Sequence, residues 1–209
     1  MSHHSKKKSR VYASAEGYDI YAELYDESLG YLSSFEKDQL LPMFGDLNGK
    51  NVLDAGAGTG RIIRDLKNYG AHVTALDTSN EMLKICKKKF SDIETVLGDV
   101  ENMPFEDDRF DLVIATFVVV HLKNLDKAFD EIYRVLKDGG SVIITNINQR
   151  KAPKLKLKNR AEIVIQSYYH RPQDVISGLE QAFFKIEKEK FIEEEGVWVN
   201  QIVKARKLT

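Results

Sequence analysis

The chain has 209 residues, and its 31 basic and 32 acidic side chains leave a formal charge of −1. This length and 43% apolar residues allow a buried core and exclude a disordered chain, while the balanced charge excludes a uniformly basic nucleic-acid binder. The longest apolar stretch, residues 112–120, is too short to span a membrane. A single cysteine, Cys86, excludes an internal disulfide and a cysteine-rich metal site. We therefore expect a reduced, cytoplasmic protein with no metal ligands and no membrane partner.

The N-terminal part of the chain combines a basic arm with a helical region. Residues 1–15 are polar, basic and aperiodic, which predicts a flexible arm. From Tyr18 onward apolar residues recur at helical spacing, with a break at Gly30 and a stop near Pro42. This pattern predicts two helices that cover one edge of a domain spanning residues 16–209.

The central part alternates strand-like and helix-like segments. The predicted strands are residues 51–55, 72–76, 94–97, 110–115 and 141–147. The predicted helices are residues 61–69, residues 78–89 with a capping box from Thr78 to Glu81, and residues 125–136 with Gly139 and Gly140 after them. Strands that alternate with single helices form parallel βαβ units.

The C-terminal part departs from this alternation. A helix is predicted from about Pro172, and two strand-like runs follow at residues 185–193 and 197–205. Neighbouring runs of this kind predict antiparallel strands. The expected fold is therefore α/β, a Rossmann-like, doubly wound and mostly parallel seven-stranded sheet with an antiparallel C-terminal edge, in a single domain.

The strongest local signal is the segment Asp-Ala-Gly-Ala-Gly-Thr-Gly from Asp54 to Gly60, which follows a strand and precedes a helix. Glycines there let the backbone approach a ligand closely. A dinucleotide fingerprint needs its third glycine three residues after the second, and Arg61 stands at that position here. The spacing argues against a nicotinamide-dependent oxidoreductase. The carboxylate of Asp54 favours a ligand with a cationic group, such as an ammonium or a sulfonium.

Three acids stand at the carboxyl ends of successive predicted strands. They are Asp54, Asp77 and Asp99. Each one alone is explained as a helix cap or a loop acid. Together they would line one crevice of an open α/β sheet, where ligands bind, and Asp77 has the position of an acid that accepts from ribose hydroxyls.

Residues 51–147, about half of the chain, resemble a class I S-adenosylmethionine-dependent methyltransferase of the type 11 family. VLDAGAGTGR resembles the family's first motif, VTALDTSNEML its second, GDVENMPFEDDRFDLVIA its third and fourth, and LKDGGSVIIT its last. The resemblance implies S-adenosyl-L-methionine as cofactor and S-adenosyl-L-homocysteine as product. It implies an in-line transfer of a methyl group, in which positioning of the nucleophile supplies much of the acceleration.

The resemblance also implies which residues contact each part of the cofactor. The methionine portion would contact Asp54, Arg61, Tyr18 and the loop residues Gly56, Ala57, Gly58 and Gly60. The ribose would contact Asp77, and the adenine would contact Thr78, Met82, Asp99 and Val100. The sulfonium would lie beside Thr116 and Phe117.

A base is needed only if the methyl acceptor must lose a proton. His121, just after the fourth strand, is the first candidate, and His170 is the second; a capping or packing role is the alternative for His121. Acceptor contacts are predicted at Tyr25, Tyr168 and Tyr169.

A basic insert, residues 148–170, follows the fifth strand. Six basic residues and no acid lie between Arg150 and Arg160. The insert is open to several interpretations: a solvated loop, an edge strand in KLKLK, or a binding site for an acidic acceptor or an RNA backbone. The first hypothesis is methyl transfer to an oxygen, nitrogen or carbon of a small molecule, including an anionic one. The alternatives are an RNA-modifying methyltransferase and a cofactor-binding protein without catalysis, and the expected assembly is a monomer or homodimer.

Overall fold

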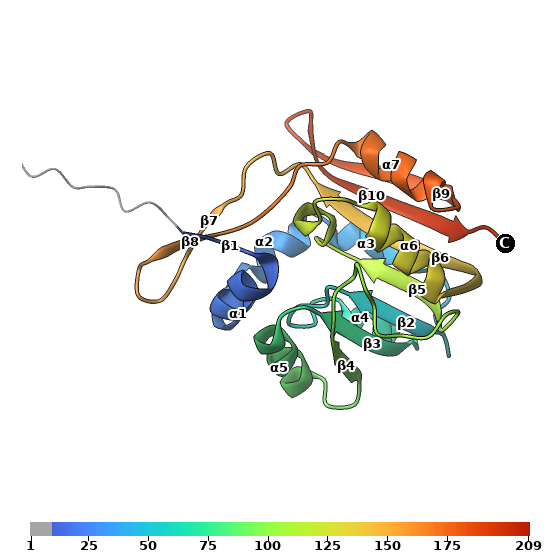
Figure 1. The fold of residues 1–209 in the computed structure, drawn as a ribbon, viewed down its shortest axis with the longest axis horizontal. Coiled ribbons are helices and arrows are strands. Elements are labelled where there is room, and N and C mark those ends of the chain that lie inside the picture. The colour runs from blue at the N-terminus through green and yellow to red at the C-terminus, as the bar shows by residue number, and fades with distance from the viewer. Residues whose placement is uncertain (1–9) are drawn as a thin grey trace, which may run out of the picture.

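A computed structural model describes residues 10–209 of the chain. Its central feature is a seven-stranded sheet in the order β4-β3-β2-β5-β6-β10-β9 (Figure 1). The strands are β2 (Asn51–Ala55), β3 (His72–Asp77), β4 (Glu94–Leu97), β5 (Phe110–Ala115), β6 (Leu136–Ile147), β9 (Phe184–Glu194) and β10 (Val197–Lys207). Strands β2 to β6 pair in parallel, and β10 pairs antiparallel with both β6 and β9. The predicted mostly parallel sheet with an antiparallel C-terminal edge is confirmed.

Helices cover both faces of this sheet (Figure 1). Adjacent residues of β2 belong to different core clusters, Val52 to one and Leu53 to the other, because successive strand side chains point to opposite faces. The cluster of Leu53 includes side chains of α6 (Asp126–Val135) and α7 (Pro172–Gln181). The cluster of Val52 includes those of α3 (Lys37–Phe44), α4 (Ile63–Asn68) and α5 (Asn80–Lys89). Burial on both faces explains the continuous apolar runs in the sequence.

The N-terminal helices differ from the prediction at two points. The helical stretch breaks at the 3₁₀ turn Asp26–Ser28, between α1 (Ser14–Tyr25) and α2 (Leu29–Ser34), so Gly30 lies inside a helix. The Ser28 hydroxyl donates to the Tyr25 carbonyl at 2.6 Å, and such side-chain bonds compete with the helical pattern. Helix α3 continues through Pro42 to Phe44, because its last residues are buried in the core. The predicted break at Gly30 is therefore wrong, whereas the predicted stop near Pro42 lies within two residues of the observed end at Phe44.

Three boundaries in the central part also shift. Helix α4 begins at Ile63 rather than at Arg61. Helix α5 is capped by Ser79, whose side chain accepts from the Met82 backbone N–H at 3.1 Å, so the cap lies one residue later than predicted. Helix α6 ends at Val135, and Leu136–Gly140 form the start of β6 instead of the helix end. The pairing of β6 with β5 is irregular there, which accommodates the two glycines as a bulge.

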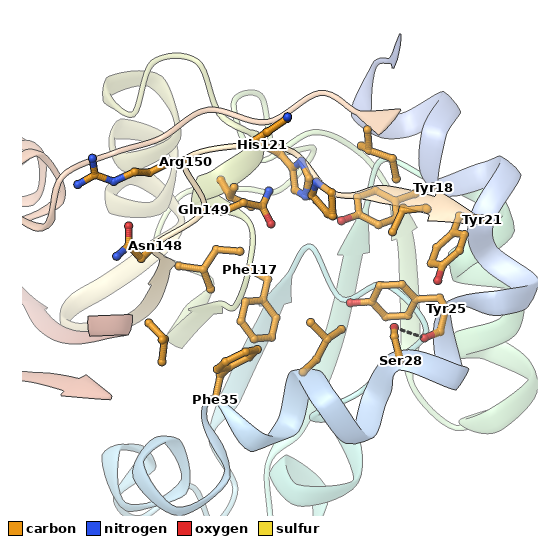
Figure 2. A pocket seen from close by; sticks show the side chains of 18 of the residues that line it. Tyr18, Tyr21, Tyr25, Ser28, Phe35, Phe117, His121, Asn148, Gln149 and Arg150 are labelled. Atoms are coloured by element: carbon orange, nitrogen blue, oxygen red, sulfur yellow. Dashed lines mark hydrogen bonds between the residues drawn. The ribbon is translucent and has the colours of Figure 1, made fainter. Parts of the chain in front are cut away.

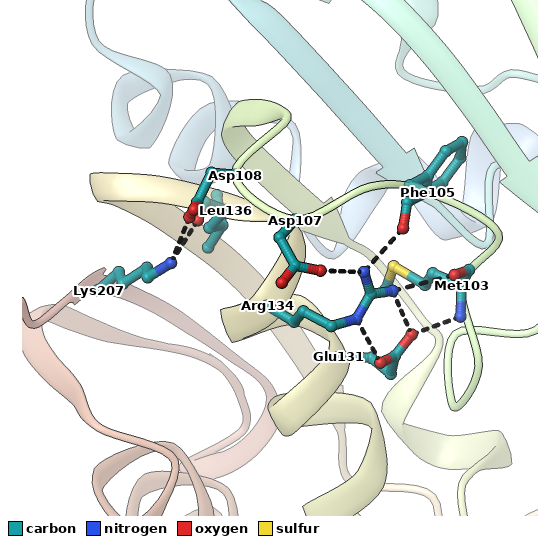
Figure 3. Close-up of polar contacts among 8 residues, drawn as sticks. All are labelled: Met103, Phe105, Asp107, Asp108, Glu131, Arg134, Leu136 and Lys207. Carbon is teal, nitrogen blue, oxygen red and sulfur yellow. Dashed lines mark hydrogen bonds and ion pairs between the residues drawn. The ribbon is translucent and has the colours of Figure 1, made fainter.

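The loop between β4 and β5 is fixed by one side chain of α6 (Figure 3). Arg134 donates to the carbonyl oxygens of Met103 and Phe105 at 3.0 and 2.7 Å and pairs with Asp107 at 2.8 Å. Glu131, one turn earlier, orients the guanidinium at 2.7 Å and accepts from the Met103 N–H. A guanidinium offers five donors in a fixed plane, so it can hold several loop groups at once. The loop after β4 is thereby held against the core.

A second, three-stranded sheet lies beside α1, in the order β1-β8-β7 (Figure 1). It contains β1 (Arg10–Tyr12), β7 (Lys154–Lys156) and β8 (Glu162–Ile165). β1 pairs in parallel with β8 through residues 10–12, and α1 begins at Ser14, so most of residues 10–15, predicted to belong to the flexible arm, take regular structure. That part of the prediction is wrong, and residues 1–9 lie outside the described residues. The edge-strand interpretation of the basic insert is confirmed, because β7 is an edge strand of this sheet.

Among residues 10–209, the helices are all too short or too polar to cross a lipid bilayer.

Candidate functional site

A cavity of about 290 Å³ lies at the carboxyl ends of β2, β3 and β5, and we call it the glycine-loop cleft. Most residues predicted to hold the cofactor line it, namely Tyr18, Gly56, Gly58, Asp77, Thr78, Met82, Asp99, Val100, Thr116 and Phe117. Tyr25 and His121 line it as well. The predicted residues Asp54, Ala57, Gly60 and Arg61 do not line the cleft. Crevices at the carboxyl ends of parallel strands are where open α/β sheets bind ligands.

The glycine loop after β2 folds back onto β3. The N–H groups of Gly56 and Ala57 donate to the Leu76 carbonyl at 2.8 and 2.9 Å. Gly56 has a φ of 76°, and a Cβ there would lie 2.3 Å from Cγ2 of Val118. Gly58 has a φ of 55°, but a Cβ placed there would meet only Cε1 of Tyr25, at an ordinary contact distance of 3.9 Å. The loop thus needs glycine at Gly56 for packing and at Gly58 for its backbone conformation.

Asp77 closes one side of the cleft at the end of β3. Its carboxylate accepts from the backbone N–H groups of Gly58 at 2.7 Å and Ser79 at 2.8 Å. Burial raises the pKa of Asp77, and these N–H groups act in the opposite direction. An ionised carboxylate has about four acceptor sites, so the carboxylate keeps capacity for further donors such as a pair of ribose hydroxyls.

Asp54, in β2, is a buried acid without a hydrogen-bond partner among the described residues. Its side chain is 1% exposed, and neither carboxylate oxygen is bonded. Burial raises the pKa of Asp54 to about 7, against the opposing effect of Arg61, and Asp77 and Glu36 raise it further. A buried, unbonded carboxylate is costly unless a cationic or donor group meets it. This orphaned acid therefore fits a positively charged ligand such as a sulfonium or ammonium compound.

Arg61 is fully engaged within the protein. Its Nη1 lies 2.6 Å from Oε2 of Glu36, and the two side chains are 10% and 1% exposed. Its Nη2 donates to the Thr116 hydroxyl at 2.9 Å, and its guanidinium lies 4.8 Å from the ring centroid of Phe117. Arg61 thus holds the end of β5 against the N-terminal helices. Its predicted contact with the cofactor carboxylate has no support in this placement.

A second cavity, of about 580 Å³, adjoins the first, and we call it the aromatic cavity (Figure 2). Its walls come from α1, α2, the end of β5, the basic insert and the start of β10. Six aromatic side chains line it, namely Tyr18, Tyr21, Tyr25, Phe35, Phe117 and Trp198. Tyr18, Tyr25, Phe117 and His121 line both cavities, so the two share one wall.

The central pair of this wall is Tyr18 and His121. Tyr18 Oη lies 2.8 Å from His121 Nε2, and His121 Nδ1 lies 3.0 Å from the Gln166 carbonyl oxygen. A carbonyl oxygen only accepts, so Nδ1 carries the proton and Nε2 accepts from the Tyr18 hydroxyl. Burial lowers the pKa of His121 and raises that of Tyr18, and both groups are therefore neutral near neutral pH.

The other predicted acceptor-site residues lie apart from both cavities. His170 Nε2 lies 2.7 Å from the Leu122 carbonyl oxygen. The backbone N–H of Tyr168 donates to the Val120 carbonyl at 2.7 Å, and the Tyr169 ring lies 5.1 Å from the Arg150 guanidinium. None of the three lines either cavity. The contacts of His170 and Tyr168 hold the insert against the segment after β5, and that of Tyr169 lies within the insert.

Several residues of the two cavities were missed in the sequence. Phe35 and Trp198 line the aromatic cavity from segments that carry no motif, and Gln149 lines it from the basic insert, where only the basic residues gave a signal. Apolar spacing before residue 44 was a signal for Phe35, but it indicates a core residue equally well. Glu36 resembles any surface acid in sequence, and only the fold brings it to Arg61.

A doubly wound sheet, a glycine loop after its first central strand and an acid at the end of the next define a Rossmann-like domain that binds a nucleoside-containing cofactor. The buried, unbonded carboxylate of Asp54 suits a cationic cofactor better than a pyrophosphate. No group of three or more metal-binding side chains occurs among residues 10–209.

Comparison with known proteins identifies the family. A family model described as a methyltransferase domain matches residues 53–144. The chain is 34% identical to the malonyl-[acyl-carrier protein] O-methyltransferase of Pseudescherichia vulneris over 141 residues, 68% of this chain and 53% of that protein. It is 34% identical to the demethylmenaquinone methyltransferase of Thermotoga maritima over 137 residues, 62% of this chain and 59% of that protein. It therefore spans little more than half the length of these relatives.

The fold comparison agrees. An S-adenosylmethionine-dependent methyltransferase from Mesorhizobium loti superposes with a TM-score of 0.70 over 82% of this chain and 97% of that one, at 18% identity. Residues 53–144 of the chain therefore match a methyltransferase domain, and the fold around them is that of class I S-adenosylmethionine-dependent methyltransferases.

Proposed function

We propose that this protein transfers a methyl group from S-adenosyl-L-methionine, bound in the glycine-loop cleft, to a small molecule bound in the aromatic cavity. The observation that carries the proposal is the wall common to both cavities, formed by Tyr18, Tyr25, Phe117 and His121. Residues that line both cavities lie where the two adjoin. A donor in one cavity and an acceptor in the other can meet in line there, as methyl transfer requires. One relative is named for malonyl-[acyl-carrier protein] and the other for demethylmenaquinone, so the matches do not agree on one acceptor.

The residues of the cleft suit the parts of the cofactor. Asp77 would accept from the ribose hydroxyls, and Thr78 and Met82 would pack on the adenine. Asp99 and Val100, after β4, would contact the adenine amino group. Asp54 would offset the positive charge of the bound molecule from beneath the loop. When bound, the cofactor supplies a methyl group activated by its sulfonium.

His121 would take up the proton that an acceptor loses. Its Nε2 is the basic nitrogen, because the Gln166 carbonyl holds the proton on Nδ1. Burial keeps the imidazole neutral, which is the form that can accept a proton. His170 is bonded to a carbonyl and lies outside both cavities, so we do not propose a role for it in the reaction.

The basic insert supports a small-molecule acceptor better than RNA. Lys154 pairs with Glu162 at 2.9 Å, and Lys158 pairs with Glu23 of α1 at 2.7 Å. Paired lysines contribute less to a phosphate-binding surface than free ones. The insert also lines the aromatic cavity with Gln149, Arg150 and Lys151, which supports a contact between the insert and the acceptor.

A transfer assay with methyl-labelled S-adenosylmethionine tests the proposal. The protein is incubated with pools of metabolites and, separately, with RNA, and label in each fraction is counted. We expect label in a small molecule and none in RNA. His121→Gln should lose most of the transfer to an acceptor that must be deprotonated, while its affinity for S-adenosylhomocysteine changes little. Binding of the cofactor without label in any fraction would contradict catalysis and favour a cofactor-binding protein.

A further inference from the structure

We propose that the aromatic cavity takes an uncharged, planar, hydroxylated aromatic molecule, and that Tyr18 receives the proton of its hydroxyl group during methylation. The inference rests on the proposed function, because it names the acceptor class of the same site. It combines three features of the cavity: its walls, its charge and the direction of its hydrogen bonds.

The walls of the cavity are aromatic on several sides. Figure 2 shows Tyr18 and Tyr25 from α1 facing Phe117 and Phe35 across the space. Trp198, the only tryptophan in the sequence, lines it from β10. Aromatic rings pack edge-to-face or offset against other rings, as Tyr18 and Tyr25 do here with centroids 5.9 Å apart. A planar aromatic ligand can make the same contacts, and a cavity of about 580 Å³ has room for more than one ring.

The interior of the cavity carries no ionised side chain among its described lining residues. The charged residues that line it are Arg150, Lys151 and Glu194, and all three are exposed, which places them at its mouth. Arg61 lies behind the Phe117 ring and is paired with Glu36. A carboxylate in the interior would therefore lose its hydration without gaining a cation from the protein, and a protonated amine would gain no anion from it. An uncharged ligand avoids both penalties.

The hydrogen bond of the shared wall has a fixed direction. The Tyr18 hydroxyl donates its proton to His121 Nε2, so its oxygen can only accept from a ligand. A ligand hydroxyl in the cavity can donate the hydrogen bond that the Tyr18 oxygen accepts. A ligand that offers only acceptor atoms cannot pair with Tyr18 without breaking the bond to His121.

The transfer then balances as follows. The acceptor oxygen bonds to the methyl carbon as the carbon–sulfur bond breaks, and the electron pair of that bond stays on sulfur. The acceptor's proton passes to Tyr18 Oη, and the proton of Tyr18 passes to His121 Nε2. The positive charge moves from sulfur to the imidazolium, whose Nδ1–H keeps its bond to the Gln166 carbonyl. The total charge of the site is unchanged.

The test is calorimetric binding to the full chain, with and without saturating S-adenosylhomocysteine, so that no turnover takes place. The probes share one ring system: 2-naphthol, 2-methoxynaphthalene, 2-naphthoate and protonated 2-naphthylmethylamine. We expect 2-naphthol to bind at least about tenfold more tightly than either charged probe, since each charged probe must bury an unpaired charge.

Two matched variants isolate the hydroxyl of Tyr18. Both Tyr18→Phe and Tyr69→Phe remove one tyrosine hydroxyl and keep the ring, but only Tyr18 is bonded to His121, and Tyr69 lines neither cavity. Tyr18→Phe should weaken 2-naphthol about tenfold and leave 2-methoxynaphthalene unchanged, because the methoxy compound has no proton to donate. Tyr69→Phe should change neither affinity.

The outcomes separate this inference from the proposed function. Equal or tighter binding of 2-naphthoate or the amine, no binding of 2-naphthol, or an unchanged 2-naphthol affinity in Tyr18→Phe would each overturn the inference. If S-adenosylhomocysteine binds and 2-naphthol does not, only the acceptor class is wrong. If S-adenosylhomocysteine does not bind, the proposed function itself fails.

Discussion

The glycine-loop cleft and the aromatic cavity share a wall, yet they are built in different ways. The cleft is formed mainly by short contiguous segments that follow strands, and its acids Asp77 and Asp99 suit polar groups of a ligand. The cavity is formed by segments far apart in the sequence, from α1 to β10, and its interior is aromatic and neutral. The difference teaches that a cofactor site can be encoded in local motifs, whereas an acceptor site depends on how distant elements pack.

The largest expected effect is a pH dependence of stability that comes from Asp54, the buried acid of the strand leading into the glycine loop. Because the pKa of Asp54 is raised from its ordinary 3.8 to about 7 in the folded protein, the unfolded chain ionises first, and the stability that the protonated group contributes is lost as pH rises from 4 to 7. Asp54→Asn lacks this loss. The difference in unfolding free energy between Asp54→Asn and wild type should therefore shift in favour of the variant by up to about 4 kcal/mol from pH 4 to pH 8.

Urea unfolding at pH 4, 6 and 8 measures this difference. Glu106→Gln is the control, because it removes a carboxyl group that is exposed. A constant difference between wild type and Asp54→Asn at all three pH values would show that Asp54 is not a strained buried acid. The same series with S-adenosylmethionine should give affinity that rises with pH in wild type and a weaker rise in the variant.

The glycine loop gives the next effect. Gly56→Ala should lower the unfolding free energy by about 3 kcal/mol, because the backbone there has a positive φ and the new methyl group would collide with Val118. Gly58→Ala has a positive φ as well but an open environment, so about 1 kcal/mol is expected, with weaker binding of S-adenosylhomocysteine. Thermal unfolding and calorimetry measure both. Equal destabilisation by the two variants would contradict the packing assigned to Gly56.

A reciprocal pair of variants sharpens the comparison of the two regions. Asp77→Asn should weaken S-adenosylhomocysteine about 50-fold, because charged hydrogen bonds to the ribose are lost, and should leave 2-naphthol within about twofold. Gln149→Ala should weaken 2-naphthol and leave S-adenosylhomocysteine within about twofold, because Gln149 lines only the aromatic cavity. Calorimetry gives all four affinities. Loss of both ligands in either variant would mean that the cavities do not bind independently.

The smallest effects are expected in the basic insert. Replacing Lys154, Lys156 and Lys158 by Ala removes exposed charges, so the melting temperature should change by no more than about 2 °C. Transfer to a small acceptor should be unchanged, and no salt-dependent RNA binding should be present to lose. An electrophoretic mobility assay over a salt series checks this. RNA binding that disappears in the variant would favour the RNA-modifying alternative.

Much of the fold was predictable because its signals are local. The seven strands, the helix from Pro172 and the antiparallel edge follow from periodicity and glycine positions. The errors arise where packing overrides a local signal. Pro42 does not end α3 because Met43 and Phe44 are buried beyond it, and residues 10–12 are ordered because they pair with β8, some 150 residues later.

The site divides in the same way. The positions of Asp77, Met82 and Asp99 follow from motifs beside strands, and they meet in one cleft. The aromatic cavity had no comparable signal, and Tyr168 and Tyr169 were predicted for it from sequence proximity to His170. Their side chains lie outside the cavity, while Trp198 from the antiparallel edge lies in its wall. Only the three-dimensional arrangement brings that edge to the N-terminal helices.

The central claim is that the methyl end of the bound cofactor lies at the shared wall. Isotope-edited NOE spectroscopy with S-adenosylmethionine carrying a ¹³C-methyl group tests it most directly. We expect NOEs from the methyl protons to the rings of Tyr18, Phe117 and His121, which line both cavities. NOEs from the methyl protons to Met82 and Val100 instead, with none to the three rings, would contradict it.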